Sequence, residues 1–384
     1  MHKGHARRSI GDLCDFFNGN GFRPPDWSAS GLPIIRIQNL NGSQNFNFFD
    51  GTPKPKWIVE PGDLLFAWAG VKGVSFGPTI WPGPRGVLNQ HIFRVVPKKG
   101  IDKYWLYLAL QVATRRIEAN AHGFKSSLVH VQKDDITDQV VDLPPLHEQR
   151  KIAEVLRTWG EGLEKLTTLR SAHEDRLIGL RDSLMARASR HGQPVCFGDF
   201  LTESRIPGTN GAIARKVSVR LYGKGATEKI EPRRGSANTR YYRRVAGQII
   251  WSKLDFLNGA FALVGPELEG CESTLDLPAF DCNSSVNPVW LIEYLTRPAY
   301  YTRQLHLARG QRKARRIAPG DWLASPVRLP DRATQDRIAD ALACARTELS
   351  LIDAQIEALT RQKRGLMQKL LTGEWRVNSE KVWA

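Results

Sequence analysis

The sequence predicts an α+β protein with two mixed α/β domains in a pseudo-twofold tandem repeat, separated by two long helices that form an antiparallel coiled coil. Three observations predict this fold. A segment that begins at Leu143 recurs 186 positions later, at Leu329. Each copy opens a long heptad pattern, and the remaining sequence consists of short β-like runs between Gly, Pro and Asn turns. The 384 residues also exceed the roughly 250 that one hydrophobic core supports.

The repeat is most visible where LPPLHEQRKIAEVL aligns with LPDRATQDRIADAL. Six residues of the first segment are identical to their counterparts in the second: Leu143, Pro144, Gln149, Ile152, Ala153 and Leu156 match Leu329, Pro330, Gln335, Ile338, Ala339 and Leu342. Within one residue, the same shift carries Gly11 onto Gly198, Gly62 onto Gly247 and Gly123 onto Gly310. We therefore predict a duplication of one domain followed by one long helix.

Both long helices are predicted from apolar residues at alternating steps of four and three, which is a heptad seam. Arg170 and His173 interrupt the first seam, and Lys363 interrupts the second. Each helix of about 35 residues would be ~50 Å long, and its narrow apolar stripe needs a partner helix. The predicted seam residues are Ile152, Leu156, Trp159, Leu163, Leu166, Leu177, Leu180 and Leu184 in the first helix, and Ile338, Leu342, Leu349, Ile352, Ile356, Leu359, Leu366 and Leu370 in the second.

The boundary between each domain and the helix that follows it is predicted at a proline, because Pro144 and Pro330 require extended backbone at the residue before them. A polar stretch, 189–194, is predicted as a linker into the second domain. The predicted boundaries are 1–143 for the first domain, 144–188 for the first helix, 189–329 for the second domain, 330–375 for the second helix and 376–384 for a C-terminal tail.

Within the domains, the runs that begin at Leu32, Asp63, His91, Gln248 and Phe261 predict strands. Helices are expected near 104–119 and 288–307. Five tryptophans lie in apolar or β-like surroundings and are predicted to be core residues: Trp68, Trp105, Trp251, Trp290 and Trp322.

Composition indicates a polyanionic partner. The 55 Lys and Arg exceed the 39 Asp and Glu, which gives a net charge of +16. No apolar run approaches the ~20 residues of a membrane-spanning helix, so nucleic acid is favoured over a membrane and the protein is expected in the cytoplasm. The five cysteines are far apart without a CxxC pair, which predicts neither a zinc site nor disulfides.

Four segments resemble the specificity subunit, usually called HsdS, of type I restriction-modification enzymes. They are GLPIIRIQNLNG from Gly31, EPGDLLFAWAG from Glu60, LPPLHEQRKIAEVL from Leu143 and QKRGLMQKLLTGEWRV from Gln362. The second domain matches only in outline, and Asp331 and Thr334 depart from the first copy.

The resemblance implies two target-recognition domains, each of which reads one half of an asymmetric, bipartite site in double-stranded DNA. It also implies that the coiled coil sets the spacing and docks methyltransferase subunits, two per chain, which bind S-adenosylmethionine. Translocase-nuclease restriction subunits would join them. This chain is then expected to be non-catalytic and to bind no cofactor or metal itself.

Two enzyme-like motifs keep an alternative open, namely a DNA methyltransferase with a fused recognition domain. Phe17 to Gly21 fits FxGxG, and Asn287-Pro288-Val289-Trp290 is one residue from N-P-P-[YFW]. They fall in different repeats, and the second lacks its second proline. A coiled-coil adaptor without DNA specificity is the other alternative.

DNA contacts are predicted where basic residues lie among Gln, Asn, Ser or His, because phosphate contacts give affinity and base-edge contacts give specificity. The segment 309–316 is the densest of these, and its repeat equivalent begins at Gly123. The predicted DNA-binding residues are Lys72, Asn89, Gln90, Lys125, Ser126, Ser127, His130, Arg240, Arg243, Arg244, Lys253, Asn258, Arg309, Gln311, Arg312, Lys313, Arg315 and Arg316.

Overall fold

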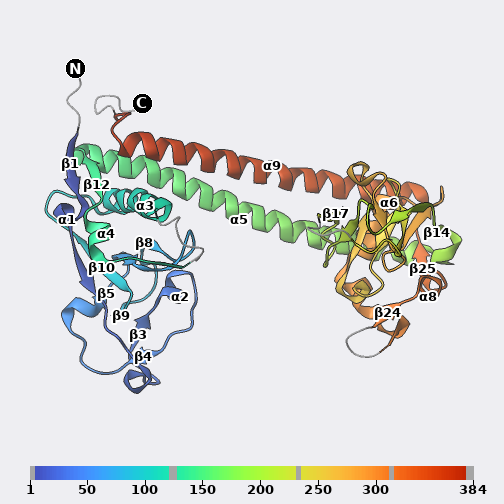
Figure 1. Cartoon of the computed structure of the whole chain (residues 1–384), viewed down its shortest axis with the longest axis horizontal. Coiled ribbons are helices and arrows are strands. Elements are labelled where there is room, and N and C mark those ends of the chain that lie inside the picture. Colours follow the sequence, from blue (N-terminus) through green and yellow to red (C-terminus); the bar gives the residue numbers. More distant parts are fainter. Residues whose placement is uncertain (1–4, 121–127, 231–234, 311–314, 378–384) are drawn as a thin grey trace. The chain divides into compact units, whose positions relative to one another are not determined.

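The computed structural model describes residues 5–120, 128–230, 235–310 and 315–377. The chain divides into two compact units: Met1–Thr167 together with Gln355–Ala384 form unit 1, and Thr168–Ala354 form unit 2. Two long helices, α5 (Leu146–His191) and α9 (Arg332–Leu371), each contribute to both units (Figure 1).

Unit 1 is built on an antiparallel four-stranded sheet with the order β2-β10-β6-β8. Its strands are β2 (Cys14–Asn18), β10 (Ile92–Pro97), β6 (Leu64–Ala67) and β8 (Gly77–Ile80), and helix α3 (Lys103–Asn120) packs beside β8. A second sheet has the order β4-β3-β9-β5 and contains the parallel pair β3 and β9. The remaining elements of unit 1 are β1 (Ala6–Ser9), α1 (Ile10–Leu13), β3 (Leu32–Ile35), α2 (Ile37–Leu40), β4 (Phe48–Phe49), β5 (Ile58–Val59), β7 (Ala69–Val71), β9 (Gly86–Leu88), β11 (Leu128–His130), α4 (Lys133–Thr137) and β12 (Val140–Leu143).

Unit 2 repeats this plan. Its four-stranded antiparallel sheet has the order β14-β22-β19-β20, made of Leu201–Ser204, Ala279–Cys282, Ile249–Trp251 and Phe261–Leu263. In both units the first strand pairs with the strand that precedes a long helix: β1 with β12, and β13 (Gln193–Cys196) with β25 (Pro326–Leu329). The other elements of unit 2 are β15 (Pro207–Asn210), β16 (Val217–Val219), β17 (Ala226–Glu228), β18 (Arg240–Arg243), β21 (Glu272–Ser273), α6 (Pro288–Leu295), α7 (Pro298–Tyr301), β23 (Ala308–Arg309), β24 (Arg316–Ile317) and α8 (Pro319–Leu323).

Each unit has a core that includes residues of both long helices. In unit 1, Ile152 and Leu156 of α5 pack with Met367 and Leu370 of α9 and with the fully buried Trp105. In unit 2, Met185 of α5 and Leu342 of α9 join a core that holds Trp251, Trp290 and Trp322, all 0% exposed. Burial of these side chains supplies the main driving force for folding in each unit.

The two helices run antiparallel in each unit. In unit 2, Arg170 of α5 bonds Asp353 of α9, and His173, one turn later, lies 3.7 Å from Glu348, one turn earlier. In unit 1, Gly160 of α5 lies against Lys363 of α9. The predicted antiparallel coiled coil is therefore confirmed.

The predicted strands and helices are found with modest shifts in their ends. Pro298 divides the helix expected near 288–307 into α6, α7 and a 3₁₀ turn, because a proline ring disrupts the preceding helical turn. The predicted linker 189–194 is wrong: α5 continues to His191, and β13 begins at Gln193. Trp68 is only partly buried, unlike the other four predicted core tryptophans.

Candidate nucleic-acid interface

Six of the predicted DNA-binding residues lie outside the described residues: Lys125, Ser126, Ser127, Gln311, Arg312 and Lys313. The others are distributed over both units, and each unit brings a subset of them together.

In unit 1, Asn89 and Gln90 form the turn between β9 and β10. The Asn89 Oδ1 accepts a hydrogen bond from Phe22 N at 3.2 Å, and Gln90 N donates to Asn20 O at 2.8 Å. The Gln90 side chain is exposed. Lys72 follows β7 and is held nearer to helix α3, because its Nζ donates to Glu118 O at 3.0 Å.

His130 ends β11 and contacts two aromatic rings. The ring centroids of His130 and His91 lie 4.9 and 4.7 Å from that of Trp68, respectively, and 6.1 Å from each other. Sequence reasoning assigned Trp68 to the core and did not select His91. The repeat alignment was the signal that could have found them, because both align with polar positions of unit 2.

In unit 2, Lys253, Arg309 and Arg316 lie on neighbouring segments. Arg309 and Arg316 face each other across the β23–β24 pair, and Ile317 N donates to Lys253 O at 3.1 Å. Arg309 pairs with Asp321 at 2.9 Å and Arg316 with Asp276 at 3.6 Å, and both guanidinium groups are largely exposed. Arg315 is exposed beside them, so this end of unit 2 is strongly basic.

Arg240 and Arg243 lie instead on β18, in the sheet β15-β18-β21, where both are exposed. Asn258 is exposed after β19 and donates to Asp255 Oδ1 at 3.3 Å.

Arg244 does not belong among the DNA-binding candidates. Its side chain is 1% exposed and donates to Ser273 Oγ at 2.8 Å, Ser204 O at 3.1 Å and Leu277 O at 3.3 Å. Burial lowers the pKa of Arg244 to about 10. This guanidinium joins strands of unit 2 from the inside, so its role is structural.

Two further arginines of unit 1 have buried guanidinium nitrogens, and the sequence did not predict either as a functional residue. Arg36 has Nε and Nη2 without a hydrogen-bond partner among the described residues, and its guanidinium lies 4.6 Å from the Trp27 ring. Arg94 Nε also has no hydrogen-bond partner among the described residues. The guanidinium carbon of Arg94 lies 5.6 Å from the centre of the Phe17 ring. Arg36 is the N-cap residue of α2 and Arg94 lies in β10, and a single arginine at such a position carries no sequence pattern that would identify it.

The two enzyme-like motifs have structural explanations. A Cβ at Gly19 would lie 2.0 Å from Asn89 O, so this glycine allows β2 to end against the 89–90 turn. Asn287 caps helix α6, with Oδ1 accepting from Val289 N and Trp290 N, and Trp290 is fully buried. Gly19 therefore serves close packing, and Asn287 serves helix capping.

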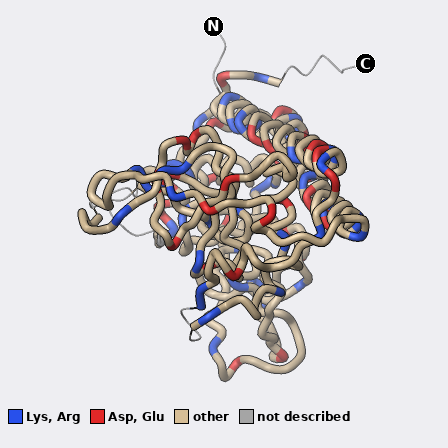
Figure 2. The backbone as a smooth tube through the Cα atoms, turned by 90° about the vertical axis from the view of Figure 1, so that its right-hand side faces the viewer, with Lys and Arg blue, Asp and Glu red and all other residues tan. Residues whose placement is uncertain are grey.

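The predicted seam residues all lie on the inner side of the long helices. Ile152, Leu156, Ile338, Leu342 and Leu370 are buried, and the other predicted seam residues are partly buried. Off the seam, Met185 and Met367 are buried in the cores, whereas Leu169 is 45% exposed and Leu351 is 65% exposed. Lys and Arg alternate with Asp and Glu along both helices (Figure 2), so the outer faces are charged in both signs.

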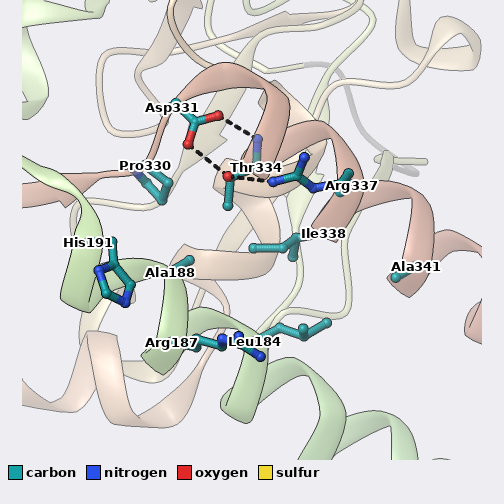
Figure 3. Close-up of a pocket in the computed structure, with 10 residues that line it drawn as sticks. All are labelled: Leu184, Arg187, Ala188, His191, Pro330, Asp331, Thr334, Arg337, Ile338 and Ala341. Atoms are coloured by element: carbon teal, nitrogen blue, oxygen red, sulfur yellow. Dashed lines mark hydrogen bonds between the residues drawn. The ribbon is translucent and has the colours of Figure 1, made fainter.

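A hollow of about 430 Å³ in unit 2 lies between the end of α5 and the start of α9 (Figure 3). Leu184, Ala188 and Ile338 form its apolar wall. At its rim Asp331 accepts from Thr334, which lowers the pKa of Asp331. Arg337 donates to Thr334 Oγ1 at 3.0 Å.

Across residues 5–120, 128–230, 235–310 and 315–377, no group of three His, Cys, Asp or Glu residues has the geometry of a metal site. Within these same ranges, every helix is too short or too polar to span a bilayer.

The geometry can be compared with known proteins. Residues 3–171 match the family described as type I restriction modification DNA specificity domain. The chain is 28% identical over 161 residues to the specificity subunit of the type I restriction enzyme EcoBI of Escherichia coli, covering 41% of this chain and 33% of that protein. It is 27% identical over 152 residues to the MjaVIII specificity subunit of Methanocaldococcus jannaschii, covering 38% and 34%. The chain thus matches about a third of the length of these curated relatives.

Solved structures match over nearly the whole chain. The type I restriction-modification S subunit from M. genitalium aligns with a TM-score of 0.55 at 14% identity and covers 96% of both chains. A structure of a type I R-M system studied for complex assembly and conformational transition gives 0.63 at 15% identity, with 97% and 98% coverage. The HsdS subunit from Thermoanaerobacter tengcongensis gives 0.51 at 15%, with 98% of both chains. Residues 3–171 are therefore similar to the type I restriction-modification DNA specificity domain, and the whole chain has the fold seen in the solved specificity subunits of those systems.

Proposed function

We propose that this chain is the sequence-specific DNA-binding specificity subunit of a type I restriction-modification enzyme. Each unit reads one half of a bipartite, asymmetric site in double-stranded DNA, and the paired helices set the spacing between the halves. The chain carries no catalytic step of its own.

The observation that carries this proposal is the repeat of one fold with different exposed side chains. Both units have the same order in their main sheet, with the equivalent strands β2 and β14, β10 and β22, β6 and β19, and β8 and β20. The polar residues at the ends of these strands differ between the units. Two copies of one scaffold with different surfaces suit two different half-sites, because base-edge contacts depend on side-chain chemistry.

The charge supports DNA as the ligand. The net charge of +16 favours a polyanion, and each Lys or Arg that contacts a phosphate adds a salt-dependent contribution to affinity. The described candidates outside the core are Lys72, Asn89, Gln90, His130, Arg240, Arg243, Lys253, Asn258, Arg309, Arg315 and Arg316.

Partners follow from the same proposal. Methyltransferase subunits, two per chain, would dock on the exposed charged faces of α5 and α9, bind S-adenosylmethionine and transfer the methyl group in the cytoplasm. Restriction subunits would join this complex. A methyltransferase with fused recognition is disfavoured because both of its motifs are explained by packing and capping.

A selection from randomised DNA duplexes tests the proposal, using the chain co-purified with its methyltransferase subunits. We expect enriched duplexes to share two short fixed blocks at a constant spacing. Recovery of duplexes without any common sequence would contradict the proposal and favour the non-specific adaptor.

A further inference from the structure

Both units join three chain segments at the same place with the same two backbone hydrogen bonds. In unit 1, Trp68 N donates to His91 O at 3.1 Å, and Val131 N donates to Trp68 O at 3.1 Å. In unit 2, Lys253 N donates to Asp276 O at 2.9 Å, and Ile317 N donates to Lys253 O at 3.1 Å. The two sets of residues are separated by 185 or 186 positions, which is the period of the repeat.

We name these places junction 1 (Trp68, His91 and His130) and junction 2 (Lys253, Asp276 and Arg316). In each, the first residue follows a central strand of the main sheet, β6 or β19, and the second precedes β10 or β22. The third lies on the strand β11 or β24. The backbone is therefore alike while all three side chains differ.

Junction 1 carries three aromatic rings, two of which have buried nitrogen atoms without a hydrogen-bond partner among the described residues. The three rings contact one another at centroid distances of 4.7, 4.9 and 6.1 Å. Trp68 Nε1 and His91 Nδ1 are shielded from solvent and have no hydrogen-bond partner among the described residues. His91 also has a φ of 71°, which is uncommon for a residue with a side chain. Unpaired polar atoms and a strained backbone are features of sites that await a ligand.

Junction 2 carries charge. The Arg316 guanidinium lies 3.6 Å from Asp276 Oδ1, and their side chains are 57% and 62% exposed. Exposed ion pairs contribute little to stability, so this contact leaves the guanidinium accessible to a ligand. An exposed guanidinium can donate two hydrogen bonds to O6 and N7 of guanine in the major groove.

We propose that the two junctions are equivalent base-reading positions, and that Arg316, which lies beside Asp276, reads a guanine in the half-site of unit 2. Junction 1 reads a different base in the other half-site, because its side chains are two imidazoles and an indole and include no Lys or Arg. This inference rests on the proposed function and deepens it by naming the positions where the two half-sites diverge.

Base preferences of Arg316 variants test the inference, measured by selection from randomised duplexes with the chain in complex with its methyltransferase subunits. R316A removes the guanidinium, and we expect it to lose roughly 10-fold to 100-fold of the preference for guanine at one position of one half-site. R316K keeps the charge but loses the planar fork, so it should lose the same preference while retaining most of the affinity. H130A should alter only the other half-site.

R205A is the matched control, because Arg205 is an exposed arginine of the same unit that pairs with Glu203 at 2.9 Å. It should leave every base preference unchanged. If R316A keeps the wild-type preferences, or weakens all sequences equally, the inference is wrong while the proposed function stands. A wild-type complex that selects no motif overturns both.

Discussion

Gln149 and Gln335 are 186 positions apart and make the same three hydrogen bonds in the two units. The Gln149 Oε1 accepts from Asp102 N at 2.8 Å, and its Nε2 donates to Pro144 O at 2.9 Å and Gly100 O at 3.3 Å. The Gln335 Oε1 accepts from Asn287 N at 2.8 Å, and its Nε2 donates to Pro330 O at 2.8 Å and Ser285 O at 3.0 Å. The Gln149 amide thereby links the start of α5 to the residue before α3, and the Gln335 amide links the start of α9 to the residue before α6.

Q149A and Q335A are expected to destabilise unit 1 and unit 2, respectively. The side chains are 2% and 0% exposed, so their removal leaves a buried N–H and two carbonyl groups without partners. Such a loss costs about 1–3 kcal/mol for each buried polar group left unpaired. Chemical denaturation followed by limited proteolysis would measure the loss and identify the affected unit. Q368A, on the exposed face of α9, should unfold like the wild type.

The repeat and the long helices could be predicted from the sequence because their signals are local and periodic. Gln149 in the segment that begins LPP and Gln335 in the segment that begins LPD occupy equivalent positions. The heptad spacing identifies the two helices without any knowledge of how the domains fold. The break at Pro298 lay in the sequence but was missed, because the apolar pattern continues on both sides of the proline.

The candidate interface was harder to predict because burial and long-range contacts decide it. Arg244 has two neighbouring basic residues in the sequence, yet tertiary packing turns it inward while Arg243 is exposed. Trp68 looks like a core tryptophan, and only its contacts with His91 and His130 reveal its position at a strand end.

Substitution in the predicted seam should separate core from surface positions on one helix. L342A removes a side chain that is 1% exposed in unit 2, and we expect a loss of about 2–5 kcal/mol in unfolding free energy. L351A removes one that is 65% exposed on the same helix and should change it by about 0.5 kcal/mol or less. Equal effects in thermal unfolding would mean that the seam is assigned to the wrong face.

Helix length should set the gap between the half-sites, because α5 and α9 connect the two units. One added heptad in each helix lengthens both by about 10 Å, equivalent to roughly three base pairs. Duplex selection should return the same two blocks with a correspondingly wider gap than the wild-type spacing. A heptad added to α5 alone would break the pairing and is the control. An unchanged gap in the double insertion would refute the spacing role.

Thiol reactivity should follow burial. Burial raises the pKa of Cys14 to about 12 and that of Cys282 to about 11, so both thiols stay protonated at pH 8. Cys344 is exposed and should react first with an alkylating reagent, as mass spectrometry would reveal. Because the folded pKa of Cys14 exceeds its unfolded value of 9.0, its contribution to stability is present below pH 9 and is lost as the pH rises towards 12. Rapid labelling of Cys14 at pH 8 in the folded chain would contradict its assigned burial.

The central claim is that this chain tells a methyltransferase which DNA sequence to modify. The most direct measurement is long-read sequencing of genomic methylation in a methylation-free host that expresses the methyltransferase subunit with and without this chain. We predict a split, asymmetric motif that is methylated only when the chain is present. Methylation that is the same without the chain, in cells where the complex demonstrably assembles, would contradict the claim.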